Sequence, residues 1–398
     1  MKDSSVLKKL FLFCSIISVG SVSASDLQNY LSSEKNQIFN YQNIKNNIES
    51  DKLHNSWISP ITASYQENWT TQPVSGTKSS GVFSIGINQP IFKSGGIYYA
   101  IKYSSILRGV NAHGIRIKKR ALIAQAINIL YSIKELKLQK RKLQLLISND
   151  NIDIKRKQES YNAGVLDSSF LDQSILKQNG DKLSLLDIES NLAKLKNSFH
   201  TLSKRNPDRL KTPHLRLITL NNYKNNNMNV IVKRLEAKEN KYKTKMVWSK
   251  YLPTISANAR YSRTDKAAPG NNKNFYTYGL TVSMPLSINS VKDIESSRVS
   301  YLQSMVELQD SRRGASLEYS MVRENLRILN KKIALSKKNE ALYRNLYKRT
   351  KDSVKAGEKT NQDEQIMLNS LKIQKISRAI YYIKKQEELL KLYTKVGH

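Results

Sequence analysis

Hydrophobic and polar residues alternate strictly in four short segments of the chain. Alternation with a period of two over roughly 9–11 residues, with aromatic side chains near the ends, is typical of a transmembrane β-strand. The segments form two pairs, within residues 60–92 and 253–285, and polar connectors are predicted at 70–80 and 263–274. A single strand of this kind is better explained by an ordinary antiparallel sheet with one wet face. The apolar positions are Ile61, Ala63, Tyr65 and Trp69; Phe83, Ile85 and Ile87; Ile255, Ala257, Ala259 and Tyr261; and Tyr276, Tyr278, Leu280, Val282 and Met284.

Apolar residues recur every seven positions in two much longer stretches, residues 97–162 and 290–355. Neither stretch contains a proline, and sustained heptads predict long helices that pack in the manner of a coiled coil. The lengths of the shorter helical segments predict that each long helix packs beside two shorter ones placed end to end. The shorter helices are expected at 27–56, 166–205, 226–250 and 360–396. The heptad positions are Ile115, Leu122, Ile129, Leu136 and Leu143, then Leu308, Ala315, Val322 and Leu329.

Landmarks of the first half of the chain recur in the second half at an offset of about 190 residues, which indicates an internal repeat. Pro60 and Pro253 precede the two strand pairs, and Ala-Gly pairs containing Gly164 and Gly357 follow the two long helices. The mature chain is therefore predicted to contain two copies of one unit. The first repeat is placed at 25–206, with strands at 60–92 and a hairpin tip at 163–165, and the second at 207–398, with strands at 253–285 and a tip at 356–358.

Residues 1–24 are predicted to be an export signal peptide. The segment begins with lysines, which are followed by an apolar run from Leu10 to Val22. This run is too short to span a bilayer, and the small residues up to Ala24 suit cleavage by a signal peptidase. A buried N-terminal helix is the alternative interpretation. The only cysteine, Cys14, lies in this segment, so the mature chain is expected to have neither disulfides nor a cysteine zinc site.

Four strands cannot close a barrel by themselves. Since an open sheet edge in hydrocarbon leaves backbone groups without hydrogen bonds, a membrane sheet must close, and single-chain barrels begin at about eight strands. The four matching strands of an exported chain therefore predict association in the membrane. Two copies would supply eight strands, too few for an open lumen, and three copies would supply twelve.

The chain resembles the TolC-like outer-membrane efflux proteins over nearly the whole mature sequence. The order, spacing and duplication of the motifs carry the resemblance. The motifs are Tyr251-Leu252-Pro253-Thr254-Ile255-Ser256 with Tyr261; Gln89-Pro90-Ile91-Phe92 followed by Gly95-Gly96; Ser160-Tyr161-Asn162-Ala163-Gly164-Val165; and Val354-Lys355-Ala356-Gly357.

The resemblance implies a fold of mixed α and β class: four transmembrane strands and long coiled-coil helical hairpins per protomer. It implies a homotrimer with a 12-stranded β-barrel in outer-membrane lipid, continued by a 12-helix α-barrel in the periplasm. It also implies a passive exit duct of a tripartite efflux or type I secretion system. The implied partners are a periplasmic adaptor (membrane fusion) protein and, through it, an inner-membrane exporter, with no cofactor and no nucleic acid.

The resemblance also assigns the candidate site residues. Gly164 and Gly357 are expected to turn the two hairpins, and Ser168 and Thr360 are expected to start the returning helices. Phe170 stands where relatives often carry an acid, while Lys359 and Asp363 match a basic and an acidic position near the periplasmic gate. Lys359 and Asp363 are expected to pair across one helical turn. The expected adaptor contacts are Ala163, Gly164, Val165, Ala356 and Gly357.

Charge distinguishes this chain from an ordinary globular protein. It has 66 Lys and Arg against 32 Asp and Glu, a formal net charge of +34. In a duct, this excess predicts a positive lumen with weak selectivity for anions, unless the lysines face outward where salt screens them. An exported basic coiled-coil protein that binds an anionic surface or nucleic acid is the alternative, as is a periplasmic adaptor subunit, but neither requires two strand pairs.

Enzymatic interpretations find little support. The sequence Gly357-Glu358-Lys359-Thr360 lacks the Gly-Lys adjacency of a phosphate-binding loop, and no strand precedes it. The five histidines show no metal-binding spacing. We therefore expect a protein without catalytic or metal-binding residues.

Overall fold

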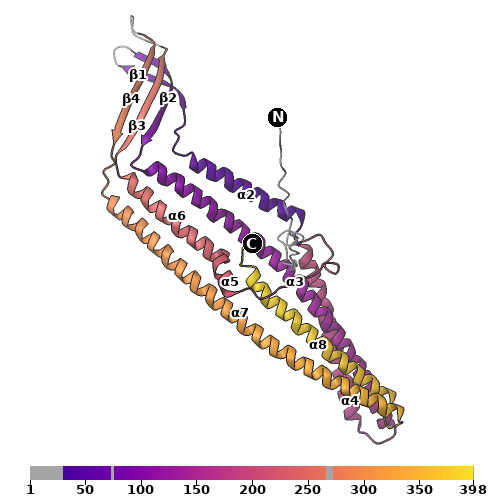
Figure 1. The fold of residues 1–398 in the computed structure, drawn as a ribbon. Helices are drawn as coiled ribbons and strands as arrows, with labels where there is room; N and C mark the ends of the chain where they lie inside the picture. Colours follow the sequence, from indigo (N-terminus) through magenta and orange to yellow (C-terminus); the bar gives the residue numbers. More distant parts are fainter. Residues whose placement is uncertain (1–29, 73–75, 266–271, 398) are drawn as a thin grey trace, which may run out of the picture.

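The computed structural model describes residues 30–72, 76–265 and 272–397, so the predicted signal peptide at 1–24 lies outside the described residues. A sheet stands at one end of a long helical body (Figure 1). Its strands are β1 (Thr62–Gln72), β2 (Gly76–Phe92), β3 (Thr254–Thr264) and β4 (Asn274–Ser283). They pair antiparallel in the order β1-β2-β3-β4, so β2 and β3 join the two halves of the chain.

The register of the sheet separates an apolar face from a polar one. On the apolar face, Ile85 lies opposite Tyr261, which in turn lies opposite Tyr276, with the two tyrosine rings 5.2 Å apart. On the polar face, the hydroxyls of Ser64 and Ser84 lie 2.9 Å apart. Large side chains of the apolar face are exposed in the protomer, which is the arrangement that the alternating pattern predicts. They include Tyr65, Trp69, Phe83, Tyr276, Tyr278, Leu280 and Val282.

The first predicted connector, at 70–80, was placed wrongly. Thr70 pairs with Lys78 and Gln72 with Gly76, so the ladder continues almost to the turn. Polar residues fit a strand as well as a turn, so the composition of this stretch does not prevent the two strands from pairing. The second connector is also shorter than predicted, because β3 continues to Thr264 and β4 begins at Asn274.

The helices follow the heptad pattern closely. The long helices are α3 (Gly96–Asn162) and α7 (Ser290–Lys355), and the returning helices are α4 (Ser168–His200) and α8 (Asn361–Tyr393). Two shorter helices, α2 (Ser33–His54) and α6 (Met228–Lys250), lead into the strand pairs. A short helix, α5 (Leu220–Asn226), was not predicted; Asn227 separates it from α6 by capping the backbone N–H groups of Asn229 and Val230.

The predicted end-to-end packing is confirmed. Helix α3 packs against α2 and α4, and α7 packs against α6 and α8 (Figure 1). The backbone N–H of Ser32 donates to Leu202 O at 2.9 Å, which joins the end of α4 to the start of α2. The N–H of Met228 donates to Lys395 O at 2.8 Å and likewise joins α8 to α6.

Side by side, these helices form a ribbon with two long edges. Because α3 also packs against α6 and α8, the order across the ribbon is α2 and α4, then α3, then α6 and α8, then α7. This order matches that of the strands, so β1, α2 and α4 lie along one edge and β4 and α7 along the other.

The core lies at the middle of the ribbon, where α3 is covered on several sides. Ile127, Tyr131, Phe199 and Leu392 are almost fully buried there, and the Tyr131 hydroxyl donates to Pro213 O in the segment that follows α4. Burial of each such side chain is worth about 1.5–3 kcal/mol, so this region anchors the two halves of the chain to each other. None of the described helices is both long enough and apolar enough to cross a membrane.

Candidate functional site

Both helical hairpins turn through the same backbone motif. At the first tip, Gly164 has a φ of +69°, and the N–H of Val165 donates to Ser160 O at 3.0 Å. At the second, Gly357 has a φ of +78°, and the N–H of Glu358 donates to Ser353 O at 2.9 Å. Each helix thus ends in a Schellman motif, in which a left-handed residue closes the helix and glycine avoids the steric cost. The predicted turning role of both glycines is confirmed.

The returning helices begin differently from each other. Thr360 starts α8, as predicted, and forms a capping box with Asp363. Ser168 does not start α4: the carboxylate of Asp167 caps the helix by accepting the N–H of Ser169 at 2.8 Å, and Ser168 is already helical. Hydrogen bonds from Ser169, that of its side chain first and that of its backbone second, favour the ionised acid and lower the pKa of Asp167. An aspartate caps at least as well as a serine, which explains the one-residue error.

The tips expose their side chains to solvent. Val165 is 81% exposed and Tyr161 45% exposed, although both are large and apolar. Ala163 and Ala356 are the C-cap residues of α3 and α7, so the five predicted adaptor-contact residues lie in the two turns. Exposed apolar side chains around a rigid turn are suited to contact another protein.

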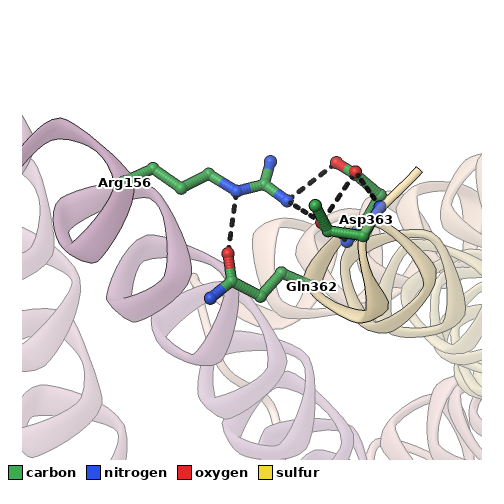
Figure 2. Close-up of polar contacts among 4 residues, drawn as sticks. Arg156, Gln362 and Asp363 are labelled. Atoms are coloured by element: carbon green, nitrogen blue, oxygen red, sulfur yellow. Dashed lines mark hydrogen bonds and ion pairs between the residues drawn. The ribbon is translucent and has the colours of Figure 1, made fainter. Parts of the chain in front are cut away.

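Behind the tips, one arginine connects the two hairpins. Arg156 of α3 lies with its Nη2 2.8 Å from Asp363 Oδ1, its Nη2 3.0 Å from Thr360 Oγ1 and its Nε 3.1 Å from Gln362 Oε1 (Figure 2). We call these four residues the tip cluster. The cluster joins the end of α3 to the first turn of α8.

The hydrogen bonds of this cluster favour the ionised form of Asp363. Its carboxylate accepts the backbone N–H of Thr360 at 3.0 Å and the Thr360 hydroxyl at 2.8 Å, in addition to Arg156. These hydrogen bonds, that from the Thr360 backbone first, lower the pKa of Asp363 to about 2.

The other two gate candidates lie outside the tip cluster. The predicted pairing of Lys359 with Asp363 across a helical turn was wrong, because Lys359 precedes the N-cap Thr360 and is not part of α8. Phe170 lies in the first turn of α4 and is half exposed. The structure therefore brings Asp363 together with Arg156, which the sequence did not single out.

Further polar contacts hold the hairpins together deeper in the ribbon. Lys177 of α4 contacts the buried Asp150 of α3. Between α3 and α8, Asn369 is 1% exposed and donates to Asn149 Oδ1 at 2.8 Å. Within the α7–α8 hairpin, Arg378 lies 2.9 Å from Glu340. These polar contacts were not predicted from the sequence, because the heptad pattern marks only apolar positions.

Glu387 is an unusual acid near the middle of the ribbon. Burial, together with the negative charge of Glu135 on α3, raises its pKa to about 7, and Glu388 adds to the effect while Lys384 and Lys391 oppose it. The folded protein thus binds a proton that the unfolded chain releases at its ordinary pKa of 4.5. It follows from linkage that the contribution of Glu387 to the free energy of unfolding falls as the pH rises from about 4.5 to 7 and stays low above that.

Glu387→Gln is therefore expected to stabilise the protein at pH 8 and to have little effect at pH 5. Allowing for solvent screening of a partly exposed group, we expect on the order of 1–2 kcal/mol, or about 1–2 °C in the thermal midpoint of a chain of this length. Thermal unfolding followed by circular dichroism at both pH values tests this. Glu295→Gln, a change of the same kind at an exposed site on α7, serves as the control. An equal effect of Glu387→Gln at both pH values would contradict the assignment.

The fold described above is that of the outer-membrane channel proteins, and the expected resemblance is confirmed at the level of the fold. The chain is similar to the outer membrane protein VceC from Vibrio cholerae, with a TM-score of 0.74 at 11% identity over 92% of this chain and 93% of that one. It is similar to CusC with a TM-score of 0.73 at 12% identity, covering 93% of this chain and 91% of CusC. It is also similar to the open state of the MtrE outer membrane channel from Neisseria gonorrhoeae, with a TM-score of 0.68 at 10% identity over 93% and 87% of the two chains.

Sequence comparison adds nothing to this likeness. No family model matches the chain, and no curated protein matches it in sequence. The similarity therefore lies in the arrangement of strands and helices, which covers nearly the full length of each channel.

Proposed function

We propose that three copies of this chain form an outer-membrane exit duct, in which a 12-stranded β-barrel continues as a 12-helix tunnel into the periplasm. The observation that carries this proposal is the four-stranded sheet, whose apolar face is exposed. Among the described residues, the outer side of each edge strand, β1 and β4, pairs with no strand. Lipid would cover the apolar face, and a neighbouring β1 against each β4 would close the barrel.

The helices support the same closure. Helix α7 carries an exposed apolar stripe on the side opposite its buried residues, and α2 and α4 carry exposed apolar residues along the other edge of the ribbon. Joining unlike edges is a heterologous contact, which closes into a ring when the rotation permits. The stripe on α7 is Val306, Leu317, Met321, Ile328, Leu335 and Leu342; its counterparts are Ile38, Tyr41, Ile44 and Ile48 on α2, and Leu176, Leu183 and Leu186 on α4.

As a duct, the protein would pass substrate from an inner-membrane exporter and a periplasmic adaptor to the exterior, within a tripartite efflux or type I secretion system. It would perform no chemistry itself. The role is supported by the likeness to outer-membrane channels and by the two exposed tips, where an adaptor would dock. The two alternatives are an exported basic protein that binds an anionic surface or nucleic acid, and a periplasmic adaptor subunit. Neither explains the exposed four-stranded sheet.

Extraction of the protein from outer membranes in detergent tests the assembly directly. Light scattering is expected to give a mass of three chains, and the complex should dissociate on heating in sodium dodecyl sulfate. A soluble monomer in the periplasmic fraction would refute the proposal.

The tips offer a separate test of docking. Gly164→Val and Gly357→Val are expected to reduce export severely while membrane insertion and the trimer persist. A Cβ at either position would meet nothing within 4 Å, so the cost is confined to the left-handed backbone, about 1–2 kcal/mol, and to the altered surface of the turn. Export can be measured as cellular accumulation of a fluorescent efflux substrate.

The control for the tip variants is Gly114→Val. Gly114 lies within α3, and a Cβ there also meets nothing within 4 Å, but its backbone is ordinary helix. If both tip variants exported as well as this control, the assignment of the tips as docking sites would fail.

A further inference from the structure

One charged side chain stands in the middle of the polar face of the sheet. Arg260 lies on β3, opposite Gly86 of β2 and Thr277 of β4. It is exposed, and it makes no ion pair with the residues that the structure describes. The side chains around it on this face are uncharged. Phe275, opposite Ser262, is large, and the others are small or polar, including Ser84, Asn88, Asn258, Ser262 and Thr281.

The neighbouring strand makes room for this arginine. A Cβ added at Gly86 would lie 3.3 Å from Arg260 Cβ and 3.4 Å from its Cγ, so the stem of the arginine lies over the glycine. The second charged residue at a polar-face register position is Lys78, opposite Thr70 near the turn, and it has the same sign. No carboxylate occupies a polar-face position of the described strands, because Glu67 lies on the apolar face, opposite Gly81.

We propose that Arg260 lines the lumen of the barrel and shifts the selectivity of the duct toward anions, such as substrates that carry carboxylate or phosphate groups. This inference rests on the proposed trimer, in which the apolar face meets lipid and the polar face encloses the lumen. Three copies of Arg260 then form one ring at a single level of the barrel.

The size of the barrel decides whether such a ring can act. Twelve strands about 4.8 Å apart, tilted by about 40°, give a backbone diameter of about 24 Å. A guanidinium reaches about 6 Å inward, which leaves it roughly 6 Å from the axis, within the Debye length of about 8 Å at physiological salt. At 1 M salt that length falls to about 3 Å, so the influence of the ring should disappear.

Purified protein in planar bilayers under a KCl gradient tests this. At an ionic strength of about 0.1 M, Arg260→Gln is expected to lower the ratio of chloride to potassium permeability roughly twofold, and Arg260→Glu further, while Arg260→Lys stays close to wild type. All four proteins should become alike at about 1 M. The matched control is Arg263→Gln, the same change three residues along β3, because Arg263 pairs with Phe83 on the apolar face.

The outcomes separate this inference from the proposed function. Normal channels whose permeability ratio is the same in wild type, Arg260→Gln and Arg260→Glu would overturn the role of Arg260 and leave the duct intact. An equal shift in Arg263→Gln would also overturn it, since the face assignment would be wrong. If wild-type protein forms no channels at all, the proposed function itself fails.

Discussion

Ile328→Asp and Leu335→Asp are each expected to abolish the trimer and, with it, every channel measured in bilayers. Both residues lie on the exposed apolar stripe of α7, opposite the buried Val322 and Leu326, and Leu335 is 61% exposed in the protomer. In the proposed assembly each would be buried against α2 or α4 of a neighbour. A carboxylate buried there without a partner costs several kcal/mol, and the ring contains three such contacts.

Light scattering of the detergent-extracted protein gives the readout for these variants. Arg323→Asp is the control, because Arg323 lies on α7, is exposed and faces away from the stripe. This substitution changes the charge of the helix more than either stripe variant does, so an effect of charge alone would be larger in the control. Circular dichroism should show that the helices of all variants form. Trimers of normal mass and stability from both stripe variants would mean that α7 does not form the contact between copies.

Periodic patterns predicted the elements of this fold because burial repeats along the chain. The period-two segments became β1 to β4, and the heptads became α3 and α7, since each pattern reports which side of an element avoids water. The tips were predictable for a similar reason: Gly164 and Gly357 satisfy a purely local need for positive φ. In contrast, the extent of β1 and β2 was underestimated, because polar residues fit an exposed strand as well as a turn.

The contacts between helices were not predictable in this way. Arg156 and Asp363 are 207 residues apart, and their meeting depends on the rotation and axial register of α3 against α8. The capping box of Thr360 and Asp363 was visible in the sequence, because its spacing is local. A partner on another helix leaves no such mark in a single sequence, which is why Lys359 was chosen instead of Arg156.

The tip cluster is expected to close the duct at its periplasmic end. If Arg156 holds α3 and α8 together at the periplasmic end, Arg156→Gln is expected to raise single-channel conductance several-fold by letting the hairpins separate. This variant leaves the capping box of α8 intact, because Thr360 and Asp363 bond to each other without Arg156. Arg156→Lys should have an intermediate effect, since lysine keeps the charge but not the fork that also binds Gln362.

The pH dependence of the wild-type channel follows from the same cluster. Since the pKa of Asp363 is lowered from 3.8 to about 2, the contact is complete above about pH 4 and weakens only as the pH falls toward 2. The contact between Arg156 and Asp363 should therefore leave wild-type conductance constant from about pH 5 to 8. Both side chains of the ion pair are about one-third exposed, so high salt should loosen it. Lys155→Gln removes a neighbouring exposed charge of α3 and is the control; if Arg156→Gln conducts no better than Lys155→Gln, the tip cluster does not close the duct.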